Sequence, residues 1–274
     1  MKKLLLTLVL TLNFALADAI SDAAAALEVG DQKTAIEKLK PACGPKNLTA
    51  CHNLALIYLN GEGEVSNLGE ALRLFKQACG GKIHASCQKV GLMYEQGIGV
   101  AKDLFTAYEY YELSCDDKFP SGCAKLAHMH ENGIGTRQNL TKATELYNKA
   151  CTQGELSACV NLGLMYQNGR GVEQNLTKAE DLYTKACEGE NSVACHNLSV
   201  LYQSKGDKQA LLLSLEKSCK FGMVENCLEL GTIYTNGTGV DQNFTKAKEF
   251  FGYACDFRDE KGCESYKILN EAGF

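Results

Sequence analysis

The fourteen cysteines of this chain form seven pairs, and the two members of every pair are eight residues apart. The pairs recur every 36 residues, except between Cys187 and Cys219, where the step is 32. A fixed period of this length is typical of proteins built from stacked repeats, in which each repeat is one supersecondary unit. The pairs are Cys43–Cys51, Cys79–Cys87, Cys115–Cys123, Cys151–Cys159, Cys187–Cys195, Cys219–Cys227 and Cys255–Cys263.

One repeat, residues 156–187, predicts two helices and a tight connection between them. Apolar residues recur at helical spacing over 158–167, and a second helical stripe follows Asn175, a residue type that favours the N-cap. Between the two stripes, Gly169 and Gly171 stand where a positive φ has the least steric cost. Each repeat is therefore predicted to be an αα-hairpin, which buries its apolar stripe only by stacking on its neighbours.

The eight-residue step also predicts how the cysteines are used. In one continuous helix, residues eight apart lie about 12 Å apart along the axis, whereas a disulfide needs Cα atoms within about 7 Å. The chain must therefore reverse between the two cysteines, and each bridge would join one hairpin's second helix to the next hairpin's first helix. Reduced, buried cysteines are the alternative. No metal site or cofactor is expected, because the cysteine pairs lack the close spacing of metal ligands and the chain has only five histidines.

The cysteine spacing and the repeat together predict an all-α fold. The expected fold is an αα-hairpin solenoid cross-linked by disulfides, in which residues 18–274 form a single domain. Two of the hairpins are short, with Gly30-Asp31 and Gly206-Asp207 as their turns. The expected elements are an N-terminal hairpin at 18–42, hairpins at 48–79, 84–115, 120–151, 156–187, 192–219 and 224–255, and a capping helix at 260–272.

Residues 1–17 have the three-part pattern of a secretory signal peptide. Two lysines precede an apolar run over 4–12, and the small residues of 15–17 form a cleavage site. The apolar run is shorter than a membrane span requires. We therefore expect a mature chain that begins at Asp18, has no membrane span, and is secreted or periplasmic, where paired cysteines oxidise.

The repeat sequences over 161–172 and 175–187, NLGLMYQNGRGV and NLTKAEDLYTKAC, resemble the Sel-one-like repeat, a relative of the tetratricopeptide repeat. The cysteine pair in every repeat, together with the signal peptide, resembles the Helicobacter cysteine-rich protein family. This resemblance covers nearly all of 18–274 and implies a secreted, right-handed αα solenoid. It also implies penicillin binding with slow β-lactamase activity and, for some members, modulation of host cells.

The residues themselves leave an enzymatic function open. Serine β-lactamases combine Ser-x-x-Lys with Ser-Asp-Asn and Lys-Thr-Gly. Ser86 with Lys89, and Ser214 with Lys217, match the first motif, but neither of the other motifs occurs. β-Lactam hydrolysis is therefore expected from the resemblance alone, and its catalytic residues stay unknown.

A ligand-binding row is predicted on the first helix of each hairpin. Positions equivalent to Asn161 and Leu164 point away from the packed stripe on a helical wheel. Amides and lysines there suit a peptide backbone or a carboxylate. Alternatively, the apolar column packs against neighbouring first helices and the polar column is merely hydrated. The polar column is Asn53, Lys89, Lys125, Asn161 and Asn197, and the apolar column is Leu56, Leu92, His128, Leu164 and Val200.

Charge narrows the expected partners. Without Lys2 and Lys3 the chain has 26 basic and 33 acidic residues, a net charge of −7. That sign disfavours nucleic acids and anionic membranes. The expected ligand is an extended peptide, a cell-wall fragment or a β-lactam, and the alternative is a non-enzymatic adaptor for a host or envelope protein.

Two further features have competing interpretations. His130 occupies a column held by tyrosine in other repeats, so we expect it to pack like a tyrosine rather than act in catalysis. Residues 173–177 and 241–245 resemble the extended sequon of bacterial N-glycosylation. Asn175 and Asn243 also suit helix N-caps, an interpretation that the repeat favours.

Overall fold

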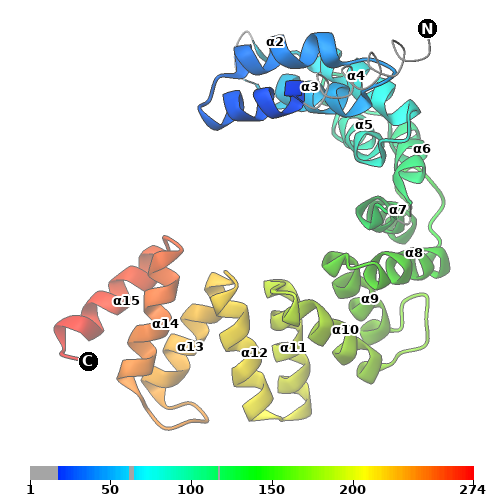
Figure 1. Cartoon of the computed structure of the whole chain (residues 1–274). Helices are drawn as coiled ribbons and strands as arrows, with labels where there is room; N and C mark the ends of the chain where they lie inside the picture. Colours follow the sequence, from blue (N-terminus) through cyan, green and yellow to red (C-terminus); the bar gives the residue numbers. More distant parts are fainter. Residues whose placement is uncertain (1–17, 62–64, 117) are drawn as a thin grey trace, which may run out of the picture. The chain divides into compact units, whose positions relative to one another are not determined.

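The computed structural model describes residues 18–61, 65–116 and 118–274, and every regular element in these ranges is an α-helix (Figure 1). The predicted all-α fold of repeated αα-hairpins is confirmed. The predicted signal peptide lies outside the described residues. None of the helices in the described ranges is long and apolar enough to cross a membrane.

The helices begin and end within one residue of the hairpin limits that the sequence predicts. The described part starts with helical residues 18–28. The helices that follow are α2 (Gln32–Ala42), α3 (Leu48–Asn60), α4 (Leu68–Gly80), α5 (His84–Gln96), α6 (Leu104–Ser114), α7 (Pro120–Asn132), α8 (Leu140–Thr152), α9 (Leu156–Asn168), α10 (Leu176–Glu188), α11 (Ser192–Lys205), α12 (Lys208–Lys220), α13 (Val224–Asn236), α14 (Phe244–Asp256) and α15 (Glu260–Glu271).

The chain divides into two compact units, one that ends at Ala143 and one that begins at Thr144. In the first unit, α3 pairs with α4 and α5 with α6, while α4 also packs on α5 and α6 on α7. Leu39, Leu54 and Phe75 belong to its buried core. The single domain expected from the sequence stays a prediction.

The second unit repeats this packing. Helices α9 and α10, α11 and α12, and α13 and α14 form hairpins, and each hairpin contacts the next through α10 on α11 and α12 on α13. The last helix, α15, packs on α14, as expected of a capping helix. Leu215, Leu230 and Phe250 are buried between these layers. Successive hairpins therefore stack within each unit.

A glycine on the first helix makes room for an aromatic ring on the second. A Cβ on Gly163 of α9 would lie 2.5 Å from a ring carbon of Tyr183 of α10, which is fully buried. Gly231 and the ring of Phe251 repeat this close approach in the α13–α14 hairpin, also at 2.5 Å. Any larger side chain at these glycines would push the two helices of a hairpin apart.

All seven predicted disulfides are present. Six of them join the end of one hairpin's second helix to the start of the next hairpin's first helix, and the seventh joins α14 to the capping helix α15. The Cα–Cα distances are from 4.2 to 4.8 Å. No cysteine in the described ranges is free. By the loop-entropy model, a bridge over so short a loop contributes about 2–3 kcal/mol to the free energy of unfolding.

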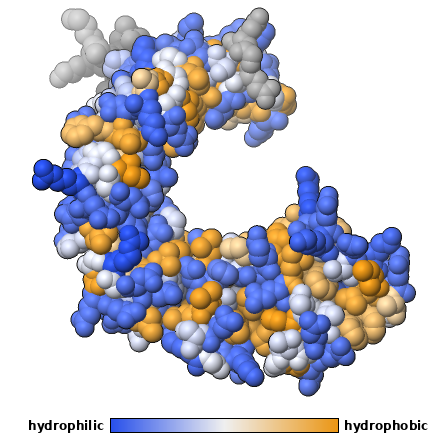
Figure 2. All heavy atoms as spheres, turned by 180° about the vertical axis from the view of Figure 1, so that it is seen from behind, coloured by the Kyte–Doolittle hydropathy of each residue, from blue (hydrophilic) through white to orange (hydrophobic). Residues whose placement is uncertain are grey.

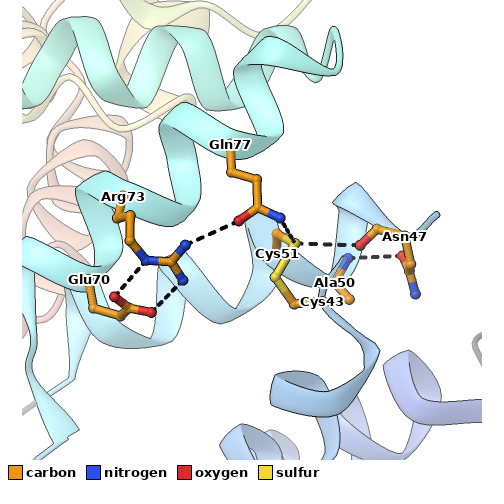
Figure 3. Close-up of a disulfide and its surroundings, with 7 residues drawn as sticks. All are labelled: Cys43, Asn47, Ala50, Cys51, Glu70, Arg73 and Gln77. Atoms are coloured by element: carbon orange, nitrogen blue, oxygen red, sulfur yellow. Dashed lines mark hydrogen bonds and ion pairs between the residues drawn. A yellow bond between two sulfur atoms is a disulfide. The ribbon is translucent and has the colours of Figure 1, made fainter. Parts of the chain in front are cut away.

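Figure 3 shows the surroundings of the first bridge, Cys43–Cys51. Asn47, in the turn between the two cysteines, caps α3 by accepting a hydrogen bond from the Ala50 amide at 3.1 Å. From α4, Gln77 donates its amide to the sulfur of Cys51 at 3.6 Å. The second helix of the hairpin therefore reaches the bridge directly.

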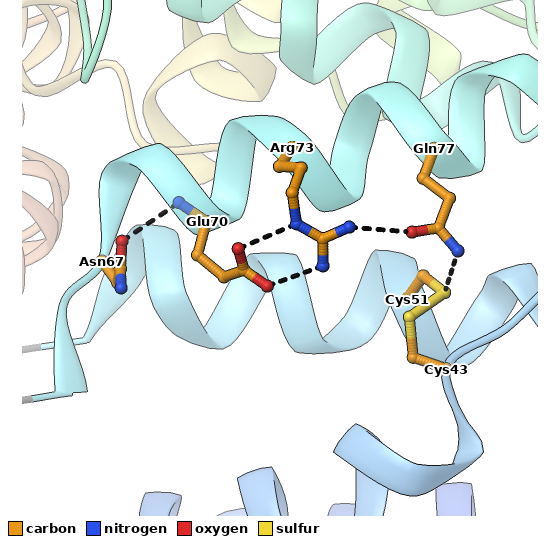
Figure 4. Close-up of polar contacts among 6 residues, drawn as sticks. All are labelled: Cys43, Cys51, Asn67, Glu70, Arg73 and Gln77. Carbon is orange, nitrogen blue, oxygen red and sulfur yellow. Dashed lines mark hydrogen bonds and ion pairs between the residues drawn. A yellow bond between two sulfur atoms is a disulfide. The ribbon is translucent and has the colours of Figure 1, made fainter.

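A row of polar contacts on α4 orients Gln77 (Figure 4). Arg73 forms two hydrogen bonds with the carboxylate of Glu70, at 2.9 and 2.7 Å, and a third with the Gln77 carbonyl at 3.3 Å. Asn67 caps the same helix through the Glu70 amide. These side chains are exposed in part, so we expect the row to contribute little stability.

Apolar side chains also reach the surface. On the face seen in Figure 2, they form small patches separated by polar residues. Val29, Phe105 and Ile268 are among the more exposed of them. Scattered apolar exposure of this kind is normal for a folded protein and does not by itself mark a binding surface.

Candidate ligand-binding site

The ten residues predicted to bind a ligand lie on five first helices, two on each. Because the two residues on a helix are three positions apart, they share one face of that helix. None of the ten is fully buried, and Lys125, His128, Leu164 and Val200 are exposed. The pairs are Asn53 and Leu56 on α3, Lys89 and Leu92 on α5, Lys125 and His128 on α7, Asn161 and Leu164 on α9, and Asn197 and Val200 on α11.

One of these pairs lies at a cavity. Asn53 and Leu56 line a hollow of about 380 Å³ in the first unit, enclosed by helical residues 18–28, α2 and α3. Its apolar wall includes Leu56, Ile20 and Leu39. The other eight predicted residues line neither this hollow nor four further hollows in the described structure.

Three carboxamides line the same cavity, those of Gln32, Asn53 and Asn60. None of the three side chains hydrogen-bonds to another described residue. A carboxamide both donates and accepts hydrogen bonds, as a peptide group does. None of the described residues that line the cavity is charged, so this lining favours an uncharged ligand that has an apolar group beside polar ones.

Asn197 occupies the same repeat position as Asn53 but has a different environment. Its Nδ2 is buried and has no hydrogen-bond partner in the part of the chain that the structure describes. A buried amide without a partner costs free energy. A ligand that supplied a hydrogen-bond acceptor to this Nδ2 would remove that cost.

Consecutive first helices are joined by polar contacts that the sequence did not reveal. The Nδ1 of His52 on α3 lies 2.7 Å from the Oγ of Ser86 on α5. The Nδ1 of His196 on α11 lies 3.2 Å from the Oδ1 of Asn226 on α13, at the equivalent position. The shared repeat position of His52 and His196 is the signal that could have predicted these contacts.

The His52 contact is set in an apolar and cationic environment. Burial, and then the charge of Lys89, lower the pKa of the His52 imidazole below its usual value. The ring also meets Phe75 edge-on, with centroids 5.5 Å apart. His52 is therefore neutral at neutral pH, and Lys89, one of the predicted ligand residues, acts on it electrostatically.

The serines of both Ser-x-x-Lys motifs are buried and form hydrogen bonds within the protein. Ser86 is fully buried and bonded to His52, a distance that suits a nucleophile and its base, but it has no surface that a substrate could reach. Ser214 is buried and donates its hydroxyl to the carbonyl of Ala210 at 2.7 Å. Ser214 and Lys217 line a small cavity of about 190 Å³.

His130 is buried and packs against an aromatic ring, as predicted from the tyrosines that occupy its position in other repeats. Its ring meets Tyr108 edge-on at 5.5 Å, and burial together with Lys142 lowers its pKa. In equivalent repeats a lysine lies over the tyrosine ring, as Lys178 does over Tyr166 at 5.0 Å. Within the described ranges, no group of three or more His, Cys, Asp or Glu side chains could hold a metal ion.

The sequence matches the profile of the Sel1 repeat over more than half of its length. The matched residues are 48–80, 84–118, 120–155, 156–191 and 227–256. The matched ranges leave out 192–226, which holds the short hairpin α11–α12. Among curated proteins, an uncharacterized protein from Haemophilus influenzae is 44% identical over 32 residues, which are 12% of this chain and 62% of that protein.

Two similar solved structures, each with a TM-score above 0.5, share the fold. A Sel1 repeat protein from Oxalobacter formigenes has a TM-score of 0.73 at 22% identity, and the match covers 86% of this chain and 99% of that one. A protective antigen of uropathogenic Escherichia coli with an SLR fold has a TM-score of 0.52 at 22% identity, over 96% of this chain and 68% of that one. Helicobacter pylori cysteine rich protein B is 27% identical, with a TM-score of 0.41, over 51% of this chain and all of its own.

Proposed function

The chain belongs to the Sel1 repeat family, and from that premise we propose that it is a protein-interaction scaffold that binds an extended peptide segment on its first helices. Stacked hairpin repeats commonly use an extended surface in this way. The observation that carries the proposal is the cavity at α3, where Asn53 and Leu56 lie together.

The cavity lining suggests how a peptide would bind. An aliphatic side chain of the ligand would enter the apolar part of the hollow beside Leu56 and Leu39. The carboxamides of Gln32, Asn53 and Asn60 would then pair with the N–H and C=O groups of the ligand's backbone. A volume of about 380 Å³ suits one or two such residues.

A displayed library of random peptides, selected on the immobilised oxidised protein, tests this function. We expect the selected peptides to be uncharged around one branched aliphatic residue. In titration calorimetry, Asn53→Ala and Leu56→Ser should weaken their binding at least tenfold. Val29→Ser is the matched control, since Val29 is 80% exposed and does not line the cavity. Peptides that bind all four proteins equally would disprove the proposal.

Penicillin binding and slow β-lactam hydrolysis form a second candidate function, which derives from the family resemblance. The observation that favours it is that Ser214 and Lys217 line one small cavity. Mass spectrometry after incubation with penicillin should then find an acyl adduct on Ser214, and Ser214→Ala should abolish nitrocefin turnover. Turnover that survives in both Ser214→Ala and Ser86→Ala would exclude the serine mechanism.

The location and the partner belong to the same proposal. Seven disulfides are typical of proteins that fold in an oxidising compartment. We therefore propose a secreted or periplasmic protein whose partner is an envelope or host protein with an exposed extended segment. A fractionation experiment that found the protein with reduced thiols in the cytoplasm would contradict this location.

A further inference from the structure

The second helix of most long hairpins begins in the same way. The hairpins that end in α8, α10 and α14 share the pattern Gln-Asn-x-Thr-Lys, at 138–142, 174–178 and 242–246. Two of these three, those at α10 and α14, also have an acidic residue directly before the glutamine. The fold itself requires only some of the residues of this pattern.

Three positions of the pattern have clear structural roles. In α10, Gln174 donates its amide to the Gln167 carbonyl at 2.8 Å and so caps the end of α9. The Oδ1 of Asn175 accepts the Lys178 amide at 2.9 Å and caps α10. The Nζ of Lys178 then lies over the ring of Tyr166.

The pattern at α14 uses the same contacts. Gln242 donates to the Thr235 carbonyl at 2.7 Å, and Asn243 Oδ1 accepts the Lys246 amide at 2.9 Å. Lys246 lies over the ring of Tyr234, again at 5.0 Å. The glutamine, the asparagine and the lysine are therefore explained by helix capping and by packing in both hairpins.

Two positions have no such role, namely the acidic residue two before the asparagine and the threonine two after it. Glu173, Thr177, Asp241 and Thr245 are all exposed. None of the four makes a hydrogen bond or ion pair with another described residue. The fold therefore does not require an acidic residue or a threonine at these positions. A role for these side chains must come from an interaction with another molecule.

Other repeats confirm that these positions are structurally free. The position two before the N-cap is occupied by Val65, Ala101 or Arg137 in the other long hairpins, and the position two after it by Gly69 in α4 and Phe105 in α6. All of these hairpins form equivalent helices. An acidic residue and a threonine occur together only around Asn175 and Asn243.

We propose that Asn175 and Asn243 are sites of N-linked glycosylation by an oligosaccharyltransferase of the bacterial type. Asn-x-Thr is the acceptor motif of N-linked glycosylation, and Glu173 and Asp241 at −2 complete the extended bacterial sequon that these segments resemble. The two structurally free positions are the two that this recognition needs. The proposal is independent of the peptide-binding function.

The capping geometry leaves the reacting atom available. Each asparagine uses its Oδ1 as the cap acceptor, while its Nδ2 has no partner among the described residues. The transfer forms a bond from Nδ2 to the anomeric carbon of a polyisoprenyl-diphosphate-linked oligosaccharide. The bond from that carbon to the diphosphate breaks, the diphosphate leaves with its electron pair, and Nδ2 loses one proton.

The chain contains its own control sites. Asn139 caps α8 through the same bond to Lys142 and is followed by Thr141, but Arg137 stands at its −2 position. Asn47 caps α3 and is followed by Thr49, with Pro45 at −2. Both have the three-residue sequon and the same cap but no acidic residue, so neither should be glycosylated.

The test is co-expression of the full-length chain with a bacterial oligosaccharyltransferase and its lipid-linked oligosaccharide in an exporting host, followed by glycopeptide mass spectrometry. We expect glycan on Asn175 and Asn243 and none on Asn47 or Asn139. Glu173→Arg should reduce occupancy at Asn175 at least tenfold without affecting Asn243, and Asp241→Arg should do the converse. Arg137→Glu should create a new site at Asn139.

Asn175→Asp and Asn243→Asp complete the design, because aspartate keeps the cap and the fold while it removes the acceptor nitrogen. Each should lose one glycan and keep the melting temperature of the unmodified chain. The proposal fails if the chain carries no glycan while a known substrate protein in the same cells does. It also fails if Asn139 is modified as fully as Asn243, or if only the isolated peptide 239–247 is modified.

Discussion

The Nδ1 of His52 lies 2.7 Å from the Oγ of Ser86, across the contact between the first helices of two consecutive hairpins. Ser86 is fully buried beside Cys87, whose disulfide to Cys79 links the same two hairpins. A covalent bridge and a buried hydrogen bond therefore lie together at one repeat interface. The stability of this interface therefore depends on both.

Removal of one partner of this hydrogen bond should destabilise the first unit. His52→Ala leaves the Ser86 hydroxyl buried without its partner, so we expect the free energy of unfolding to fall by about 1–3 kcal/mol. Urea unfolding of the oxidised protein measures the change. His128→Ala is the control, because His128 is exposed and its loss should change the free energy by less than about 0.5 kcal/mol. Equal effects of the two substitutions would contradict the structure.

The same histidine should make stability depend on pH. Its pKa is lower in the folded protein than in the unfolded chain, because of burial and Lys89, so the unfolded chain binds more protons in this range. Stability is then full above the unfolded value of about 6.5 and falls as the pH drops below it. Urea titrations between pH 8 and pH 5 should show this decline.

The control for the pH effect is His52→Gln. Glutamine occurs at the equivalent position of the next repeat, where Gln88 donates to Ser121 at 2.8 Å, so it should keep a hydrogen bond without titrating. The pH dependence should become smaller in this variant, though His130, whose pKa is also lowered, should retain part of it. An unchanged pH profile would show that His52 does not titrate as described.

The glycine on the first helix should be sensitive to the smallest enlargement. In Gly163→Ala, the new Cβ would lie 2.5 Å from the ring of Tyr183, so the hairpin must shift or the ring must leave its position. We expect a loss of about 1–3 kcal/mol, measured by thermal unfolding. Gly80→Ala, where a Cβ meets nothing within 4 Å, should be neutral or slightly stabilising. A neutral Gly163→Ala would contradict the packing of α9 on α10.

Loss of a single bridge should weaken the protein without unfolding it. The double substitution Cys187→Ser with Cys195→Ser removes the link between α10 and α11 and should cost about 2–3 kcal/mol by the loop-entropy model. Circular dichroism should still show the full helix content, because the apolar core between these hairpins remains. A complete loss of helix signal at room temperature would show that the bridges, and not the core, determine the fold.

Much of the fold could be predicted because the repeat encodes it locally. The step between Cys151 and Cys159 forces a chain reversal, and the glycines near Gly169 and the cap at Asn175 mark the helix limits. These signals come from residues that are close in sequence. The same signals recur every 36 residues, so one repeat predicts the helix limits of the others. The helix limits were therefore within one residue of the structure.

The site could be predicted only in part. Asn53 and Leu56 share one face of α3, where Leu56 packs in part against the core, and their role in binding stays a prediction. The cavity beside them is also lined by Ile20 and Leu39 of the N-terminal hairpin, and the sequence did not show how that hairpin packs on α3. The contact of His52 with Ser86 depends on the distance between α3 and α5. A helical wheel shows on which side of its own helix a side chain lies, but it does not show how far away the neighbouring helix is. For the same reason the sequence could not show that Ser86 is buried.

The most direct test of the account is the mapping of disulfides in proteolytic fragments of the unreduced protein. We predict seven linkages, each between cysteines eight residues apart, with no thiol that reacts with an alkylating reagent in the denatured protein. Six of them should join consecutive hairpins, and the seventh should join the last hairpin to α15. Free thiols at any of these positions, or a linkage between cysteines of distant hairpins, would contradict it.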